Sequence, residues 1–92
     1  MAKLSESDIQ QRLGQVGQWQ RDGDAIRREF KFKDFVGSMG FVTKVALLAE
    51  KADHHPDITI GYNRVALVLS THSDGGLTAK DFDLAQKIDA VV

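Results

Sequence analysis

Residues 58–72 read ITIGYNRVALVLSTH, two apolar runs separated by a short polar turn. Runs of this length, rich in Ile, Val and Leu and broken by turn residues, are typical of a β-hairpin. We expect one strand over residues 58–62, a turn at Asn63-Arg64 and a second strand over residues 65–72. The rest of the chain can be placed around this hairpin.

A second hairpin is indicated upstream, over residues 19–32. Asp22-Gly23 supplies its tight turn. After the turn, apolar and charged side chains alternate, and this period of two predicts a strand with one wet face. The apolar positions of that strand are Ile26, Phe30 and Phe32.

Helical patterns flank and separate the two hairpins. Each begins with a side chain that can cap a helix N-terminus, and each continues with apolar residues at helical spacing. The first begins at Ser5 and ends at Gly17; the middle one, capped by Asp34, runs from Phe35 to about Ala52; the last begins at a Thr78-Asp81 capping box and continues its apolar face to Val92.

The order of elements is therefore α-β-β-α-β-β-α. Strands that arrive as hairpin pairs, with helices between them, predict an α+β fold. We expect a four-stranded antiparallel sheet built from two hairpins, with three helices on one face. With one proline and no low-complexity stretch, residues 1–92 should form a single domain.

The middle helix carries more apolar surface than one sheet needs. Two neighbouring apolar stripes cover about half of its circumference at roughly 100° per residue. We assign one stripe to the sheet and the other to a partner subunit, which predicts a homodimer or homotetramer through residues 35–52; burial by helices of the same chain is the alternative. The sheet-facing stripe is Phe35, Met39, Val42, Ala46 and Ala49, and the partner-facing stripe is Phe41, Val45, Leu48 and Ala52.

The composition excludes several classes of function. Twelve basic and thirteen acidic residues give a net charge of −1, which offers no electrostatic reason for direct nucleic-acid binding. The chain has no cysteine, so disulfides and thiolate metal sites are excluded. No apolar run approaches the roughly 18 residues of a membrane span, and the start, MAKL, does not resemble a signal peptide. We expect no membrane association and a cytoplasmic location.

All three histidines of the chain, His54, His55 and His72, flank the 58–72 hairpin. The start of one antiparallel strand lies beside the end of the next, so the fold should bring the histidine-bearing segments together. Imidazole has an ordinary pKa of about 6.5, and such side chains can give and take protons near neutral pH. The pattern favours acid/base chemistry on one substrate.

Neighbouring residues support this interpretation, and plainer ones remain open. Glu50 lies one helical turn before His54 and could orient its ring, while Pro56 holds the histidine pair in an extended or turn conformation. Asp74-Gly75-Gly76 is first of all a turn, and Asp81 is primarily a helix-capping residue. A histidine near a strand end is often a surface or capping residue.

A metal site is the main rival. The three histidines, with Asp53 and Asp57, could ligate zinc or iron. However, adjacent residues in an extended chain point to opposite sides, so His54 and His55 are poorly placed to hold one ion. The sequence also lacks a Gly-x-Ser-x-Gly elbow and a glycine-rich phosphate loop. We expect no metal and no organic cofactor.

The spacing of these residues resembles the pterin-4a-carbinolamine dehydratase family. The matching core reads EKADHHP over residues 50–56, then five residues, Tyr62, nine residues, His72 and finally Asp81. Segments such as Phe32-Lys33-Asp34-Phe35 and Gly76-Leu77-Thr78 are also similar to family members. The likeness runs from about Trp19 to Ile88.

The resemblance implies an activity and a role for each candidate residue. The substrate would be 4a-hydroxytetrahydrobiopterin, and elimination of water would give a quinonoid dihydropterin in tetrahydrobiopterin recycling. His54 and His72 would be the general acid/base pair, and His55 would bind and position the pterin. Glu50 and Asp53 would support the first imidazole. The residues implied to shape the pocket are Pro56, Thr71, Ser73 and Asp74, with Asp81 in a supporting role.

The resemblance also implies partners. Animal members of the family act as dimerisation cofactors of a homeodomain transcription factor, which would add a nuclear location. An aromatic amino acid hydroxylase is another implied partner, because it produces the substrate. The alternative to an enzyme is therefore a non-catalytic coactivator or a hydroxylase-regulating module.

Overall fold

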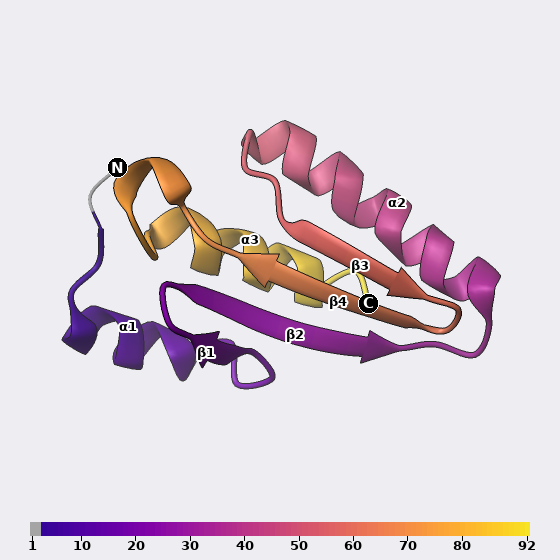
Figure 1. The fold of residues 1–92 in the computed structure, drawn as a ribbon, viewed down its shortest axis with the longest axis horizontal. Helices are drawn as coiled ribbons and strands as arrows, with labels where there is room; N and C mark the ends of the chain where they lie inside the picture. The colour runs from indigo at the N-terminus through magenta and orange to yellow at the C-terminus, as the bar shows by residue number, and fades with distance from the viewer. Residues whose placement is uncertain (1–2) are drawn as a thin grey trace.

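The computed structural model describes residues 3–92, which form one antiparallel sheet and three α-helices (Figure 1). The predicted α+β class and the order α-β-β-α-β-β-α are confirmed. The elements are α1 (Glu6–Leu13), β1 (Gln20–Asp22), β2 (Ala25–Lys31), α2 (Phe35–Ala52), β3 (Asp57–Gly61), β4 (Arg64–Leu69) and α3 (Ala79–Asp89). Within the described range, no helix is both long and apolar enough to cross a bilayer.

The strands lie in the order β1-β2-β4-β3, so the two hairpins meet at their second strands. β2 and β4 form the centre, with Ile26 opposite Leu69 and Phe30 opposite Val65. The side chains of Val65 and Leu69 are fully buried, whereas Val68 on the opposite face is partly exposed. The helices therefore cover one face of the sheet, and the other face carries Arg27, Glu29 and Lys31 of β2.

Capping side chains start the helices as the sequence predicts. Ser5 Oγ accepts from the N–H of Asp8 (3.2 Å), and Asp34 Oδ1 accepts from the N–H of Gly37 (2.8 Å). Thr78 opens α3 with a complete capping box. The bounds of α2 match the prediction from end to end.

Two helix ends were predicted too late in the chain. α1 stops at Leu13, and Gly14, a poor helix former, is its C-cap in place of Gly17. Tight turns follow, in which the N–H of Val16 donates to the carbonyl of Leu13 (3.2 Å). At the other end, α3 stops at Asp89, so Val92 lies outside the helix and is exposed.

The two apolar stripes of α2 were assigned the wrong way round. Phe41 and Val45 face the sheet and are buried, with Val45 fully enclosed, whereas Met39 is 39% and Phe35 50% exposed. Aromatic contacts set this rotation, because the ring centroid of Phe41 lies 4.7 Å from that of Phe30. Helical spacing identified both stripes, but it did not determine which of them packs against β2. Of the residues assigned to the sheet, Ala49 is buried and Val42 packs partly buried against the core, so these two assignments were correct. Leu48 and Ala52, assigned to a partner, also pack partly buried against the core.

Both hairpin turns lie one residue away from their predicted positions. Gly23 and Asp24 connect β1 to β2, with Gly23 at φ 60°. Tyr62 and Asn63 connect β3 to β4, and Tyr62 takes a positive φ of 44°. The second strand of the later hairpin also ends at Leu69 rather than continuing to residue 72, which places the third histidine on a loop.

Candidate active site

The two adjacent histidines lie between the end of α2 and the start of β3. Asp53 closes α2 in a left-handed conformation, with φ 50° and ψ 44°. The N–H of His54 donates to the carbonyl of Ala49 (3.1 Å), so the chain turns back sharply at this point. After the bend the two imidazoles diverge: His54 is buried and His55 is exposed.

His54 contacts a buried carboxylate of α3. Its Nε2 lies 2.5 Å from Oδ1 of Asp81, and the Asp81 side chain is fully buried. The second oxygen, Oδ2, accepts hydrogen bonds from the hydroxyl of Thr71 and from the backbone N–H of Thr78, each at 2.9 Å. Asp81 is therefore at once the helix cap that the sequence predicts and the direct partner of His54.

The carboxylates implied to support His54 lie elsewhere. Glu50 pairs with His55 instead, with 2.6 Å between Oε1 and Nε2. This pair is open to solvent, since the side chain of His55 is 56% and that of Glu50 77% exposed. Asp53 is exposed at the end of α2. Glu50 was expected to support His54. It does not, because the left-handed bend at Asp53 turns the His54 ring away from the face of α2 that carries Glu50.

The third histidine lies on a short loop after β4. His72–Asp74 form a 3-10 turn, and Gly75 follows with φ 76°. The loop is closed at its base, where the N–H of Thr71 donates to the carbonyl of Gly76 (3.1 Å) and the N–H of Gly76 donates back (3.3 Å). His72 and Ser73 are exposed on this loop.

One carboxylate joins the two histidine-bearing segments. Asp81 contacts His54 from the first segment and Thr71 from the second, although residues 71 and 54 are far apart in the sequence. Within residues 3–92, no hydrogen bond links His72 directly to His54 or His55. Thr71 is buried in this network, so it acts on Asp81 rather than lining an open pocket. Pro56 and Asp74 are partly buried beside the two segments.

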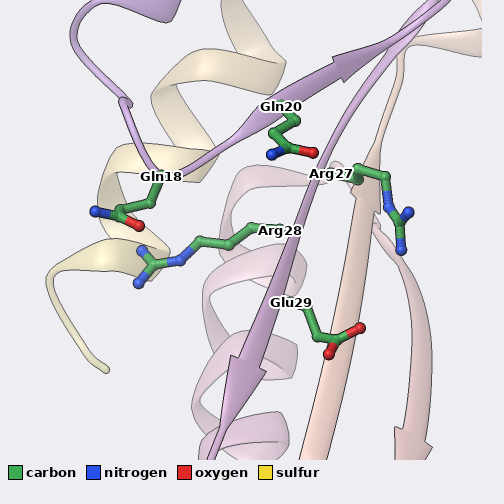
Figure 2. A pocket seen from close by; sticks show the side chains of 5 residues that line it. All are labelled: Gln18, Gln20, Arg27, Arg28 and Glu29. Carbon is green, nitrogen blue, oxygen red and sulfur yellow. The ribbon is translucent and has the colours of Figure 1, made fainter.

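A hollow of about 210 Å³ adjoins His54. It is bounded by the end of α2 and by one side of α3, and its lining residues are Ala52, His54, Lys80, Asp83, Leu84 and Lys87. A different hollow, of about 310 Å³, lies beside β2 and contains no candidate residue (Figure 2). There Arg28 points toward Gln18, away from Arg27 and Glu29, and its guanidinium is bonded to Asp89 at 2.7 Å. The hollow at His54 is therefore the better candidate for substrate access.

The arrangement favours proton transfer over metal binding. Across the described part of the chain, no three His, Asp or Glu side chains converge in a way that could hold a metal ion. An imidazole held by a buried carboxylate is, by contrast, a common general acid or base, because the carboxylate orients the ring and stabilises its charged form.

Sequence reasoning missed the contribution of two threonines. Thr78 was identified as a cap, but its hydroxyl also lies 2.9 Å from that of Thr71, which links α3 to the histidine loop. The capping box itself was visible in the sequence. The direct contact of Asp81 with His54 was not predicted, because the two residues are 27 positions apart in the sequence.

Comparison with known proteins identifies the family to which the chain belongs. The family model described as pterin 4 alpha carbinolamine dehydratase matches residues 2–91. A relative from Acidobacterium capsulatum is 51% identical over 92 residues, with 100% of both chains covered. One from Sulfolobus acidocaldarius is 48% identical over 89 residues, covering 97% of this chain and 98% of the relative. Both are provisionally named pterin-4-alpha-carbinolamine dehydratases.

A solved structure shares the fold as well as the sequence. The crystal structure of a transcriptional coactivator/pterin dehydratase from Brucella melitensis superposes with a TM-score of 0.93 and 44% identity, over 97% of each chain. The family match spans nearly all of the residues, and the relatives are matched over almost their whole length. The chain therefore belongs to the pterin-4a-carbinolamine dehydratase family.

Proposed function

We propose that this protein is a hydro-lyase that removes water from 4a-hydroxytetrahydrobiopterin and releases a quinonoid dihydropterin in tetrahydrobiopterin recycling. The observation that carries the proposal is the contact between His54 and the buried Asp81. A buried carboxylate that holds an imidazole supports acid/base chemistry at this position. The names of the relatives support the pterin substrate.

The reaction needs two proton movements and nothing else. One proton must reach the hydroxyl that leaves carbon 4a as water, and one must leave the neighbouring ring nitrogen as the new C=N bond forms. Electrons and atoms balance without an oxidant or reductant, so we propose catalysis without a cofactor. His54 and His72 serve as the acid/base pair, and His55 positions the pterin.

The environments of the histidines suit different roles. His54 is buried and held by Asp81, so its ring is oriented before the substrate arrives. His72 is exposed on its loop, where it can meet a ligand and exchange protons with water. The exposed Glu50–His55 pair and Ser73 are available for direct contact with substrate, whereas Thr71 is engaged by Asp81.

The test is the rate of dehydration of a 4a-hydroxytetrahydropterin above the spontaneous rate. His54→Ala and His72→Ala should each lower this rate by about 10²–10⁴-fold, the usual contribution of a positioned proton donor or acceptor. The double variant should lose less than the product of the two losses, since both groups act on one substrate. Single variants with near-normal rates and unchanged circular dichroism would refute the proposal. Activity that disappears with a chelator and returns with one ion would favour the metal alternative.

We also propose a homodimer or homotetramer through α2, with the exposed face corrected. Large apolar side chains remain exposed on this helix, and burying each one against a partner would contribute about 1.5–3 kcal/mol. The exposed members are Phe35, Val36, Met39 and Leu47.

Two matched variants separate this outer face from the core face. Leu47→Glu should lower the assembly state measured by light scattering and leave the fold intact. Val45→Glu should instead unfold the subunit, because Val45 is fully buried within its own chain. A wild-type protein that is monomeric at tens of micromolar would contradict the assembly proposal.

The second candidate function is a non-catalytic binding module that uses this outer face of α2. It is favoured by the exposed apolar side chains and by the name of the Brucella melitensis structure, which includes a coactivator. The partner would be a transcription factor or an aromatic amino acid hydroxylase. Assembly without any dehydration rate would support this candidate over the enzyme. A cytoplasmic location stays a prediction under either function.

A further inference from the structure

The protons around Asp81 can be assigned from the donors that surround it. The backbone N–H of Thr78 can only donate, and it lies 2.9 Å from Oδ2. The hydroxyl of Thr71 donates to the same oxygen at 2.9 Å. Asp81 also lies in the first turn of α3, where the helix dipole stabilises negative charge. These three features favour the ionised carboxylate, so Oδ1 accepts a hydrogen bond from the N–H at Nε2 of His54.

The two threonines give the network a direction. The N–H of Lys80 donates to Oγ1 of Thr78 (3.3 Å), which leaves the Thr78 hydroxyl proton free to point toward Thr71, 2.9 Å away. Thr71 then passes its own proton toward Asp81. Each hydroxyl in the network then accepts one hydrogen bond and donates one. If the bond between the two hydroxyls were reversed, Oγ1 of Thr71 would face Oδ2 of Asp81 with no proton between the two oxygens. The position of the Asp81 carboxylate is therefore fixed from both sides.

The other nitrogen of the His54 ring remains for chemistry. Within residues 3–92, every buried polar side-chain atom has a hydrogen-bond partner, and the one hydrogen bond found for the His54 ring is at Nε2. Nδ1 therefore retains some solvent-accessible area. With Nε2 carrying the proton, Nδ1 of the neutral ring presents a lone pair.

We propose that Asp81, held by Thr71 and Thr78, is a positioning residue that keeps His54 protonated at Nε2, so that His54 exchanges protons with the substrate through Nδ1. This inference deepens the proposed function and rests on it for the identity of the substrate. It also gives Thr71 a role: the residue before His72 maintains the carboxylate that orients His54.

The variant Asp81→Asn tests the assignment. In the variant the amide oxygen should face the two donors, Thr71 and Thr78, which leaves the NH₂ group facing Nε2 of His54. Because the NH₂ group can only donate, Nε2 must accept its hydrogen bond, and the ring proton must move to Nδ1. Since every hydrogen bond is still made, the fold should survive, while kcat falls by about 10²–10⁴-fold with little change in KM.

Imidazole ¹⁵N spectra provide a readout that a loss of stability would not mimic. In alkaline buffer, where free imidazole is neutral, the wild-type protein should show His54 protonated at Nε2, and Asp81→Asn should show it protonated at Nδ1. His54→Ala identifies the resonances. Asp89→Asn is the matched control, because Asp89 lies on the same helix and also accepts two side-chain donors, Trp19 and Arg28, away from the histidines. It should keep kcat within about twofold.

Three results would overturn the inference: a wild-type His54 protonated at Nδ1, an Asp81→Asn enzyme with normal kcat, or an Asp89→Asn enzyme as impaired as Asp81→Asn. If Asp81→Asn does not fold, Thr71→Val and Thr71→Ser replace it. Thr71→Val removes one hydrogen-bond donor to Asp81 and should lower kcat. Thr71→Ser keeps a hydroxyl donor and should retain most of the wild-type kcat. Equal kcat values for the two variants would contradict the inference. A protein without dehydratase activity but with the predicted ring proton would refute the proposed function and leave the assignment of Asp81 standing.

Discussion

His54 and His55 are neighbours in the chain, and each ring nitrogen lies against a carboxylate at almost the same distance, 2.5 Å for Asp81 and 2.6 Å for Glu50. The two pairs differ in their surroundings. Asp81 is fully buried and has two further donors, whereas Glu50 and His55 are mostly exposed. An exposed ion pair is screened by water and contributes about 0–1 kcal/mol. A buried one is costly to break, because its remaining partner is left without a bond.

The distance between an imidazole nitrogen and a carboxylate oxygen therefore does not by itself identify the catalytic pair. The buried pair has a fixed geometry, as expected of a group that must be oriented before substrate binds. The exposed pair can rearrange when a ligand arrives, as expected of a group that positions it. Four changes test this contrast, and they follow in order of expected effect.

The largest effect should come from Asp81→Ala. The change removes the capping-box acceptor of α3, leaves Nε2 of His54 and the N–H of Thr78 without an acceptor, and leaves Thr71 with the hydroxyl of Thr78 as its remaining side-chain partner. We expect unfolding to become easier by roughly 3 kcal/mol, from the lost cap and the unsatisfied donors together. Urea denaturation followed by circular dichroism measures this free energy. A loss below about 0.5 kcal/mol, the range of ordinary surface changes, would show that burial adds nothing to the pair.

Thr71→Val should have the next largest effect on stability. Valine keeps the shape of the side chain but removes the hydroxyl that donates to Asp81 and accepts from Thr78. We expect a loss of about 1–2 kcal/mol, typical of a hydrogen bond to a charged group in a buried site. Thr71→Ser serves as the control and should recover most of the stability. Equal stabilities for the valine and serine variants would mean that the hydroxyl is not part of the network.

His55→Ala should affect binding more than folding. In the described part of the chain, the exposed ring of His55 hydrogen-bonds to Glu50 alone, so the free energy of unfolding should change by less than about 0.5 kcal/mol. If His55 positions the pterin, KM should rise by about tenfold, which corresponds to roughly 1.4 kcal/mol of lost binding. Steady-state kinetics separates KM from kcat. A variant in which kcat falls as far as in His54→Ala would place His55 in the proton-transfer step and end the contrast between the two rings.

Glu50→Gln should have the smallest effect. The amide can still hydrogen-bond to His55, and the charge it removes is in water. We expect stability within about 0.5 kcal/mol of wild type. The matched change in the buried pair, Asp81→Asn, should differ from it by its effect on kcat. Equal losses of kcat in the two variants would show that exposure does not distinguish the pairs.

The sequence predicted the fold well wherever a local rule applies. The caps at Ser5, Asp34 and Thr78 placed the helix starts, and the alternation in residues 25–32 placed β2. Local rules failed where two solutions were equally good. The two stripes of α2 were both apolar, and the contact of Phe41 with Phe30, across the fold, chose between them.

The sequence predicted which residues form the site, but not which of them pair with one another. The histidines and Asp81 were visible as a spaced pattern. Their pairing depended on the left-handed bend at Asp53, which turns His54 toward α3 and leaves Glu50 to His55. A single residue in that conformation has no clear sequence pattern when it is not glycine. The early end of β4, which leaves His72 on a loop, likewise depends on the bridge between Thr71 and Gly76.

The most direct test of the account is the dehydration rate of His54→Ala, measured beside wild type and His55→Ala with a 4a-hydroxytetrahydropterin and corrected for the spontaneous reaction. The account predicts that His54→Ala loses about 10²–10⁴-fold in kcat, while His55→Ala keeps most of its kcat and loses affinity. A His54→Ala protein that folds normally and dehydrates the substrate at the wild-type rate would contradict the claim that the buried pair of His54 and Asp81 is the catalytic centre.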